Sequence, residues 1–309
     1  MPRALWTIAK GHVELRETSL GEGIEITTEF SGISRGTEAL VLAGSVPESE
    51  WSRMACPLQS GSFPFPVKYG YAAVGRTPES ARVFCLHPHQ DRFTAPAEML
   101  IPIPNPIPSE RAILAANMET ALNIVWDAEV APGDKVAVIG AGVVGALTAW
   151  LAARIPGTKV TLIDINPDRI TLAKTLGCNF ALPENAPENC DICIHTSASS
   201  AGLTTAIACA GFEAKIIEAS WYGDRATPTP LGGAFHSQRL QIKASQVGHV
   251  PPARRARWTY RRRMETALSL LAASELDALI SGETEFSALP TRYPDILADP
   301  GTLCHRIKY

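Results

Sequence analysis

Residues 135–164 read KVAVIGAGVVGALTAWLAARIPGTKVTLID, and this stretch decides the fold. It opens with an apolar, β-branched run that predicts a buried parallel strand. A glycine-rich turn follows at once, and then an alanine- and leucine-rich segment that suits a helix. A second apolar run ends on Asp164. The order strand, glycine turn, helix, strand and acid is typical of a dinucleotide-binding unit.

Each residue of the turn has a physical role in holding a dinucleotide. Gly140 permits the tight turn, Gly142 lets a pyrophosphate approach the backbone, and Gly145 lets the helix pack close to the strand. Val143 and Val144 open the helix, where unpaired N–H groups and the helix dipole favour anions. A glycine-rich turn that binds no ligand is the structural alternative, which the complete unit disfavours.

Asp164 indicates which dinucleotide is bound. It stands 19 residues after Gly145, where a carboxylate can accept hydrogen bonds from the hydroxyl groups of the adenosine ribose. A 2′-phosphate at the same place would meet a like charge, so the sequence favours NAD(H) over NADP(H). Arg169 lies close enough along the chain to weaken that preference.

Composition narrows the class of protein. The chain has 309 residues, of which 46% are hydrophobic and 19% charged, so one or two globular domains are expected. A net charge of -3 gives no reason to expect nucleic acid or an anionic membrane as a partner. Neither a signal peptide nor an apolar run of about 20 residues is present, so we expect a cytoplasmic protein.

Two groups of residues could be read as ligand sites but also have purely structural interpretations. Cys190 and Cys193 form the only C-x-x-C pair, but no second pair completes a zinc site, and all seven cysteines are expected to be thiols. Six arginines at 254–263 form a basic cluster on an expected long helix at 254–273. We interpret the cluster as a solvated helix face, with a phosphate-bearing ligand as the alternative.

The rest of the chain surrounds the dinucleotide unit with two kinds of pattern. Residues 1 to about 116 indicate short strands and many turns, including a polar loop at 31–38. From 135 to 244, apolar runs alternate with helical segments, which predicts a doubly wound parallel sheet. The tail indicates a short helix at 293–298 and a final strand at 303–308.

Three short motifs carry a resemblance to a known family. Ser34-Arg35-Gly36-Thr37-Glu38 is similar to a Cys-Gly-Thr-Asp segment, Gly70-Tyr71-Ala72 to a Gly-His-Glu segment, and residues 131–136 to a Pro-Gly-Asp-x-Val segment. In this order and spacing they resemble the medium-chain dehydrogenase/reductase superfamily of the alcohol dehydrogenase type. The nearest branch resembles bacteriochlorophyllide-type and threonine dehydrogenase-like proteins.

The resemblance implies an α/β architecture with two domains. A Rossmann NAD(P)-binding domain is expected at 118–253, and a β-rich, GroES-like catalytic domain at 1–117 and 254–309. The family also implies a small-molecule substrate and a homodimer joined through the nucleotide-binding sheets.

The departures from the family pattern concern zinc. Arg35, Tyr71 and Ala72 stand where the zinc enzymes have metal ligands, with Asn117 or its neighbours at the last ligand position. Arginine cannot ligate zinc, and alanine has no donor atom. The four-cysteine structural zinc lobe is missing too, so we expect no metal. His87 and His89 could suggest a substitute site, but surface or pocket histidines are the favoured interpretation.

Without a metal, side chains must handle the proton of an alcohol. By resemblance, Thr37 matches the hydroxyl group of the family's proton relay. Tyr71 is a candidate proton donor or acceptor, or else a packing residue. Arg35 is a candidate for binding a carboxylate or an oxyanion, as is Lys68, or else forms an ion pair with Glu38 or Glu119.

These residues support a zinc-independent, NAD(H)-dependent oxidoreductase acting on an alcohol/carbonyl pair. A quinone or enoyl reductase of the same superfamily is the second hypothesis, although such enzymes usually prefer NADPH. A non-catalytic NAD(H)-binding sensor or partner subunit is the third.

Overall fold

The computed structural model describes residues 1–309, which divide into two compact units. The first unit comprises Met1–Ala116 and Met264–Tyr309, and the second comprises Asn117–Arg263. The first boundary thus lies within one residue of the sequence-based division at 117. The chain returns to the first unit at Met264 rather than at residue 254, so the arginine cluster falls in the second unit.

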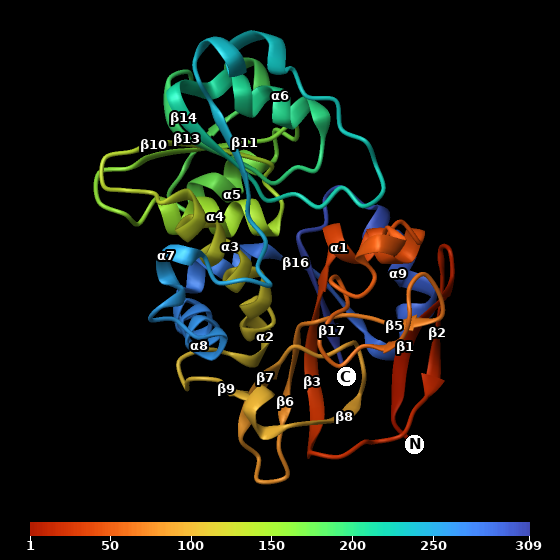
Figure 1. The fold of residues 1–309 in the computed structure, drawn as a ribbon. Helices are drawn as coiled ribbons and strands as arrows, with labels where there is room; N and C mark the ends of the chain where they lie inside the picture. The colour runs from red at the N-terminus through yellow and green to blue at the C-terminus, as the bar shows by residue number, and fades with distance from the viewer. The chain divides into compact units, whose positions relative to one another are not determined.

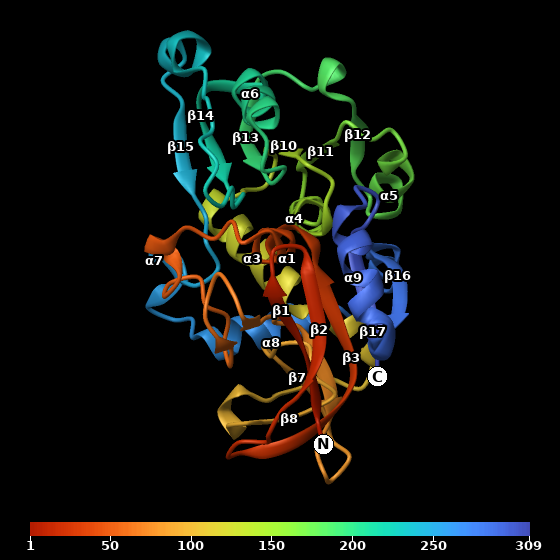
Figure 2. The same ribbon diagram turned by 90° about the vertical axis from the view of Figure 1, so that its right-hand side faces the viewer.

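The second unit contains one six-stranded sheet in which every neighbouring pair of strands is parallel. The strands lie in the order β12-β11-β10-β13-β14-β15, which Figure 2 shows from right to left. The strands that follow β10 in the chain are added on one side of it, and those that follow β13 are added on the other side. The pair β10 and β13 is therefore the switch point of the sheet. The bounds are β10 Lys135–Ile139, β11 Lys159–Ile163, β12 Asn179–Ala181, β13 Cys190–His195, β14 Ala210–Glu218 and β15 Gln241–Ala244.

Helices cover both faces of this sheet. In Figure 1, α6 lies on the opposite side of the strands from α4 and α5, as right-handed crossovers on either side of a switch point require. Buried side chains of β10, β13, β14 and α6, among them Ile139 and Ile216, form one apolar cluster. The helices of the unit are α3 Ala115–Ala128, α4 Val143–Ala152, α5 Arg169–Thr175, α6 Ser200–Cys209, α7 Pro252–Arg255 and the start of α8 Tyr260–Leu270. The doubly wound parallel sheet that the sequence predicted is confirmed.

The first unit is built on two mainly antiparallel sheets. One has the order β2-β1-β5-β4; the other has the order β16-β17-β3-β6-β7-β9, with β8 also paired to β3. The strands are β1 Arg3–Ala9, β2 His12–Glu17, β3 Ile24–Ser34, β4 Ser60–Gly61, β5 Val67–Lys68, β6 Ala73–Arg76, β7 Arg82–Cys85, β8 Arg92–Ala95, β9 Ile101–Pro102, β16 Ile280–Glu285 and β17 Cys304–Lys308. The helices are α1 Arg35–Ala43, α2 Ser109–Ala112 and α9 Leu289–Ala298.

The two ends of the chain share a core in this unit. Leu5, Ile33, Leu289 and Ile307 are at most 3% exposed and belong to one apolar cluster. Burying each such side chain contributes about 1.5–3 kcal/mol. β17 pairs antiparallel with β3, with Cys304 opposite Ser34. The tail therefore holds the end of β3 in place.

This pairing corrects the polar loop that the sequence indicated at 31–38. β3 continues through Ser34, and α1 begins directly on Arg35. The local sequence looks irregular because it is polar and contains two glycines. Its extended conformation is stabilised by β17, which lies far away along the chain.

The prediction of one long helix at 254–273 is also wrong. α7 ends at Arg255, and a separate α8 begins at Tyr260. The hydroxyl group of Thr259 accepts a hydrogen bond from Arg262 N at 3.1 Å, so this threonine caps a new helix. Trp258, in the break, packs against Trp126 at 4.6 Å between ring centroids.

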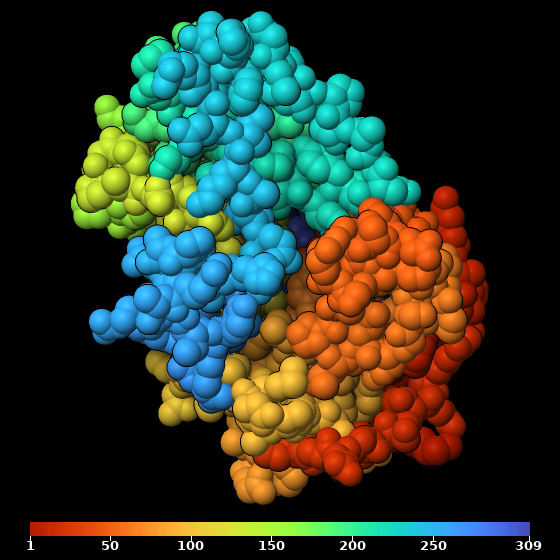
Figure 3. Space-filling view, in the orientation of Figure 1, coloured from red at the N-terminus to blue at the C-terminus, as the bar shows by residue number.

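The arginine cluster divides between surface and interior. Figure 3 shows the blue segment of α7 and α8 at the surface. Arg263 is instead 2% exposed and forms an ion pair with Glu119 at 3.0 Å. No helix in the structure is long and apolar enough to cross a membrane.

Candidate functional site

In the glycine turn between β10 and α4, the local backbone requires glycine at two of the three glycine positions. A Cβ on Gly145 would lie 1.9 Å from the carbonyl oxygen of Gly140, and Gly140 has a positive φ of 104°. A Cβ on Gly142 would meet nothing within 4 Å. The open space at Gly142 fits the approach of a phosphate group to the backbone.

The helix after this turn begins without a side-chain cap. Gly142 is the N-cap residue of α4, and no side chain bonds to the first turn. The backbone donors of Val143 and Val144 therefore face the turn with the positive end of the helix dipole. This chemistry matches an anionic group such as a pyrophosphate.

Asp164 follows β11 and closes the glycine turn. Its Oδ2 accepts a hydrogen bond from Ala141 N at 2.6 Å, and its Oδ1 accepts one from Asn166 N at 2.9 Å. Each carboxylate oxygen retains a further lone pair for a ribose hydroxyl group. Arg169 is the first residue of α5. The predicted cofactor residues thus lie around one end of the parallel sheet and fit a dinucleotide.

In the first unit, the structure brings together two of the three predicted catalytic residues. The hydroxyl group of Tyr71 is hydrogen-bonded to the side chains of Thr37 and Ser34. Burial, followed by the negative charge of Glu38, raises the pKa of Tyr71 well above its usual value. Tyr71 stays protonated at neutral pH and is suited to donate a hydrogen bond.

The third predicted residue, Arg35, is engaged by the protein. Its Nε donates to the carbonyl oxygen of Leu297 at 3.1 Å. Leu297 lies in the last turn of α9, where a cation interacts favourably with free carbonyl groups. No ion pair joins Arg35 to Glu38 or to Glu119, so neither of the two ion-pair alternatives that the sequence left open is formed.

Glu38 is the centre of a buried polar network. It is 0% exposed, and its Oε1 accepts a hydrogen bond from Ser34 N at 2.7 Å. Its Oε2 accepts from the hydroxyl group of Tyr293 at 2.6 Å and lies 2.9 Å from Nε2 of His89. The other ring nitrogen of His89 lies 2.8 Å from the hydroxyl group of Ser31. The network satisfies the carboxylate with partners from both ends of the chain.

Lys68 lies buried without an acidic partner. Its Nζ donates to Oε1 of Gln90 at 2.8 Å, and burial lowers its pKa. The lysine is near the thiol of Cys56, whose pKa burial raises to about 12. The hydrogen-bond acceptor of the Lys68 ammonium group is thus a neutral amide oxygen, that of Gln90.

The side chains near the family's zinc positions form a poor donor set. Ala72 is buried and offers no donor, and Tyr71 is bonded to hydroxyl groups. His87 and His89 are 3% and 0% exposed, so neither is a surface histidine. His87 stacks on Phe93, and burial lowers its pKa to about 3. No group of three His, Cys, Asp or Glu side chains is arranged to hold a metal ion.

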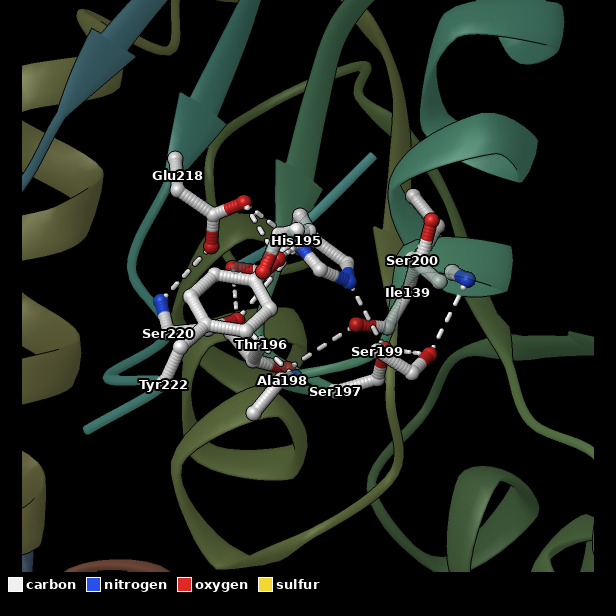
Figure 4. Close-up of polar contacts among 12 residues, drawn as sticks. Ile139, His195, Thr196, Ser197, Ala198, Ser199, Ser200, Glu218, Ser220 and Tyr222 are labelled. Carbon is white, nitrogen blue, oxygen red and sulfur yellow. Dashed lines mark hydrogen bonds and ion pairs between the residues drawn. The ribbon is translucent and has the colours of Figure 1, made fainter. Parts of the chain in front are cut away.

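The sequence analysis missed a second polar network, which lies in the second unit (Figure 4). His195 ends β13 and is 0% exposed. Its Nε2 lies 2.7 Å from the hydroxyl group of Ser197, and its Nδ1 lies 2.7 Å from Oε2 of Glu218. Tyr222 donates to the same Glu218 oxygen at 3.0 Å.

A signal for this network was present in the sequence. His195 and Glu218 are polar residues that directly follow the apolar runs at 192–194 and 216–217. Carboxyl ends of neighbouring parallel strands meet at one edge, where ligands bind. The two residues are adjacent partners in the register of β13 and β14.

Comparisons with known proteins agree with this architecture. Residues 117–216 match the family model described as alanine dehydrogenase/PNT, C-terminal domain. The chain is 25% identical to an uncharacterized zinc-type alcohol dehydrogenase-like protein of Haemophilus influenzae, over 74% of this chain and 68% of that protein. It is 32% identical to an L-threonine 3-dehydrogenase of Rhizobium rhizogenes, over only 31% of this chain and 28% of that protein.

Solved structures share the fold over the whole chain. L-idonate 5-dehydrogenase from Escherichia coli has a TM-score of 0.81 at 13% identity, covering 100% of this chain and 98% of that one. A short chain alcohol dehydrogenase from Escherichia coli in complex with NADH has a TM-score of 0.78 at 14% identity, covering 100% and 99%. An oxidoreductase from Salmonella enterica in complex with NADP has a TM-score of 0.70 at 16% identity, covering 100% of both chains.

Proposed function

We propose that this chain is an NAD(H)-dependent oxidoreductase of the zinc-type alcohol dehydrogenase-like kind of medium-chain dehydrogenase, a proposal supported by the matched family model and by the relatives reported above. Its substrate would be an alcohol/carbonyl pair, and its chemistry would not use zinc. The observation that carries the proposal is the open cradle at Gly142, flanked by the uncapped start of α4 and by Asp164.

The choice of NAD(H) depends on Asp164. Solved proteins of this fold bind NADH in one case and NADP in another, so the fold alone permits either cofactor. Here a carboxylate is held beside the glycine turn by two backbone donors. It can accept hydrogen bonds from ribose hydroxyl groups, whereas a 2′-phosphate would bring a second negative charge next to it.

The chain's own residues must hold and move the proton. A bound nicotinamide supplies a carbon that accepts or donates hydride. The hydroxyl group of Tyr71, bonded to Thr37 and Ser34, is suited to donate a hydrogen bond to a carbonyl oxygen that is being reduced. Arg35 is less suited to bind a substrate carboxylate or oxyanion, because its Nε already donates to a carbonyl group of α9.

Independence of zinc is supported by the nature of the side chains. Both ring nitrogens of His89 have partners, and Nδ1 of His87 lies 2.8 Å from the carbonyl oxygen of Pro88. Glu38 already has three hydrogen-bond partners. Binding a metal here would require breaking buried hydrogen bonds, each of which costs about 1–3 kcal/mol if a partner is left unsatisfied.

The cofactor assignment is tested by titrating the purified protein with NADH and with NADPH while following fluorescence. We expect NADH to bind more tightly, and Asp164→Asn to weaken NADH binding by about tenfold or more, since bonds to charged groups contribute about 1.5–3 kcal/mol. Asp168→Asn, on the exposed turn before α5, is the matched control. If Asp164→Asn and Asp168→Asn had the same affinity for NADH and the same affinity for NADPH, the assignment would be contradicted.

A homodimer is a further part of the proposal. β15 forms the outer edge of the six-stranded sheet, and all four of its residues are exposed, including Ile242. An open edge of this kind can pair with another strand. Light scattering on the purified protein is expected to give twice the chain mass, whereas a monomer at micromolar concentration would argue against pairing through this edge.

A further inference from the structure

The network of His195, Ser197, Glu218 and Tyr222, which we call the β13–β14 network, lies at a defined place on the dinucleotide edge. Asp164, at the end of β11, marks the side on which the adenosine ribose binds. A bound pyrophosphate would be held at the glycine turn after β10. A dinucleotide crossing the switch point would therefore extend its nicotinamide half toward the ends of β13 and β14, where this network lies.

Direct contacts join the network to the glycine turn. The hydroxyl group of Thr196, between His195 and Ser197, donates to the carbonyl oxygens of Ile139 and Gly140 at 3.0 and 2.9 Å. A Cβ on Gly140 would lie 2.9 Å from the backbone nitrogen of Ser197. The network and the phosphate-binding turn are thus parts of one rigid edge.

The hydrogen bonds of His195 resemble those of a catalytic serine–histidine–acid triad. With Glu218 ionised, Nδ1 of His195 donates to the carboxylate, so Nε2 is left to accept from the hydroxyl group of Ser197. A histidine held in this way can accept a proton at Nε2 while the carboxylate stabilises the resulting charge.

The network extends from the interior to the surface. His195 is completely buried, but Ser197 is half-buried and its hydroxyl group contacts the exposed Ser199 at 2.9 Å. At the other end, the side chain of Glu218 is 16% exposed. A proton can therefore enter at the serine hydroxyl groups and leave at the carboxylate.

Space for this arrangement depends on one helical glycine. A Cβ on Gly202 of α6 would lie 2.1 Å from the hydroxyl oxygen of Ser197 and 2.7 Å from Nε2 of His195. Any other residue at this position would displace the Ser197–His195 pair. The helix thus leaves room for the two side chains to meet.

The charged and titratable groups around His195 favour proton transfer. Burial tends to raise the pKa of Glu218, but interactions with His195, together with hydrogen bonds from Ser220, outweigh it and hold this pKa below its usual value. Burial, followed by the charge of Glu218, raises the pKa of Tyr222, so this residue remains a donor. Arg225 lies over the ring of Tyr222 at 6.0 Å.

We propose that Ser197, His195 and Glu218 form a proton relay for the nicotinamide half of the cofactor site. The proposal rests on the function proposed above. In alcohol oxidation, the C–H bond breaks and its electron pair passes to the nicotinamide as hydride. The O–H bond breaks, and its proton passes to Ser197, whose own proton moves to Nε2 of His195. The products are a carbonyl compound, reduced cofactor and an imidazolium paired with Glu218.

The relay has a test that needs no substrate. Protein with ¹⁵N-labelled histidine is titrated with NAD⁺ and, separately, with ADP-ribose, which lacks the nicotinamide. His195→Gln assigns the His195 ring signals by their disappearance. We expect NAD⁺ to shift the His195 ring nitrogens while ADP-ribose leaves them nearly unchanged. If the protein binds NAD⁺ but the His195 signals do not move, the relay is excluded.

Kinetics then separate a proton-transfer role from a purely structural one. With any alcohol that is turned over, His195→Gln and Ser197→Ala are expected to lower kcat by about 100-fold and to flatten its pH profile, with NADH affinity little changed. His236→Gln, an exposed histidine of the same unit, is the matched control. Full activity of both relay variants would overturn the proposal. A shift of the His195 signals without turnover of any alcohol would support the subsite and count against the proposed function alone.

Discussion

At the residue scale, Tyr71 determines how the first unit can handle a proton. Its hydroxyl group is bonded to Thr37 and Ser34, and burial beside Glu38 raises its pKa. The family motif alone indicated Thr37 as a hydroxyl-bearing candidate, and the contact between the two residues emerges only when Gly70-Tyr71 is folded against the start of α1. The raised pKa keeps Tyr71 protonated at neutral pH, so its hydroxyl group can donate a hydrogen bond to a carbonyl oxygen.

Replacing Tyr71 with phenylalanine tests this assignment. Tyr71→Phe removes one oxygen atom and is expected to lower kcat for carbonyl reduction by about 100-fold, because one hydrogen-bond donor to a developing oxyanion contributes about 10²–10³-fold. NADH affinity should stay the same. Tyr69→Phe is the matched control, since Tyr69 packs edge-on against Tyr71 with ring centroids 6.0 Å apart. Equal loss of activity in both variants would indicate a packing role instead.

Single residues also show where sequence reasoning stops. Arg35 could be recognised as unsuited to bind zinc, since that depends on its own chemistry. Its partner, the carbonyl group of Leu297, could not be identified, because the contact joins positions far apart in the chain. The same reason hid the pairing of Glu119 with Arg263.

At the element scale, the turn between β10 and α4 was predicted almost completely. Its strand, glycines, helix and acid are neighbours in sequence, so local patterns determine them. β3 was predicted too short because β17 stabilises its last residues. The break between α7 and α8 was missed, although Thr259 provides a local capping signal.

Two glycines of the same turn should respond differently to the same substitution. Gly145→Ala places a Cβ 1.9 Å from the carbonyl oxygen of Gly140, so α4 must move away. We expect a loss of about 1–3 kcal/mol in unfolding free energy. Gly142→Ala introduces its Cβ into open space at a φ of -70°, so stability should hardly change.

Cofactor affinity is expected to fall in both glycine variants. In Gly142→Ala, the new methyl group occupies the space where a phosphate would approach, so NADH binding should weaken while the melting temperature stays the same. Urea unfolding and fluorescence titration measure the two effects separately. A Gly142→Ala protein that binds NADH normally would contradict the proposed position of the pyrophosphate.

At the scale of the whole molecule, the two units have separate tasks. The first unit is closed by its own termini, since β17 pairs with β3. The second holds the dinucleotide edge and the β13–β14 network. Periodicity predicted the doubly wound sheet of the second unit, whereas the β-rich, GroES-like domain was implied by the resemblance to a known family. The network around Glu38 could not be predicted, because hydrogen bonds between distant residues leave no periodic pattern, and the β13–β14 network was indicated only by polar residues at the ends of two apolar runs.

Stability of the first unit should depend on pH through His87. Its pKa is about 3 in the folded protein against 6.5 ordinarily, because the ring is buried. Unfolding therefore takes up a proton between these values, and stability falls by about 1.4 kcal/mol per pH unit as the pH drops below 6.5. His87→Phe keeps the stacking on Phe93 and should flatten this dependence.

Urea unfolding of the wild type and of His87→Phe at several pH values between 4 and 7 measures this contribution. His12→Gln is the control, because His12 is exposed on β2 of the same unit. Identical pH dependence in the wild type and in His87→Phe would mean that His87 is already protonated in the folded protein.

The central claim is hydride transfer with NAD(H) and without zinc. The most direct measurement follows NADH oxidation at 340 nm by protein that has been treated with a chelator, shown to be metal-free by elemental analysis and mixed with a panel of aldehydes, ketones and keto acids. The account predicts turnover of at least one carbonyl compound, unchanged when zinc is added back. Activity that appears only after zinc is restored, or NADH binding without turnover of any carbonyl compound, would contradict it.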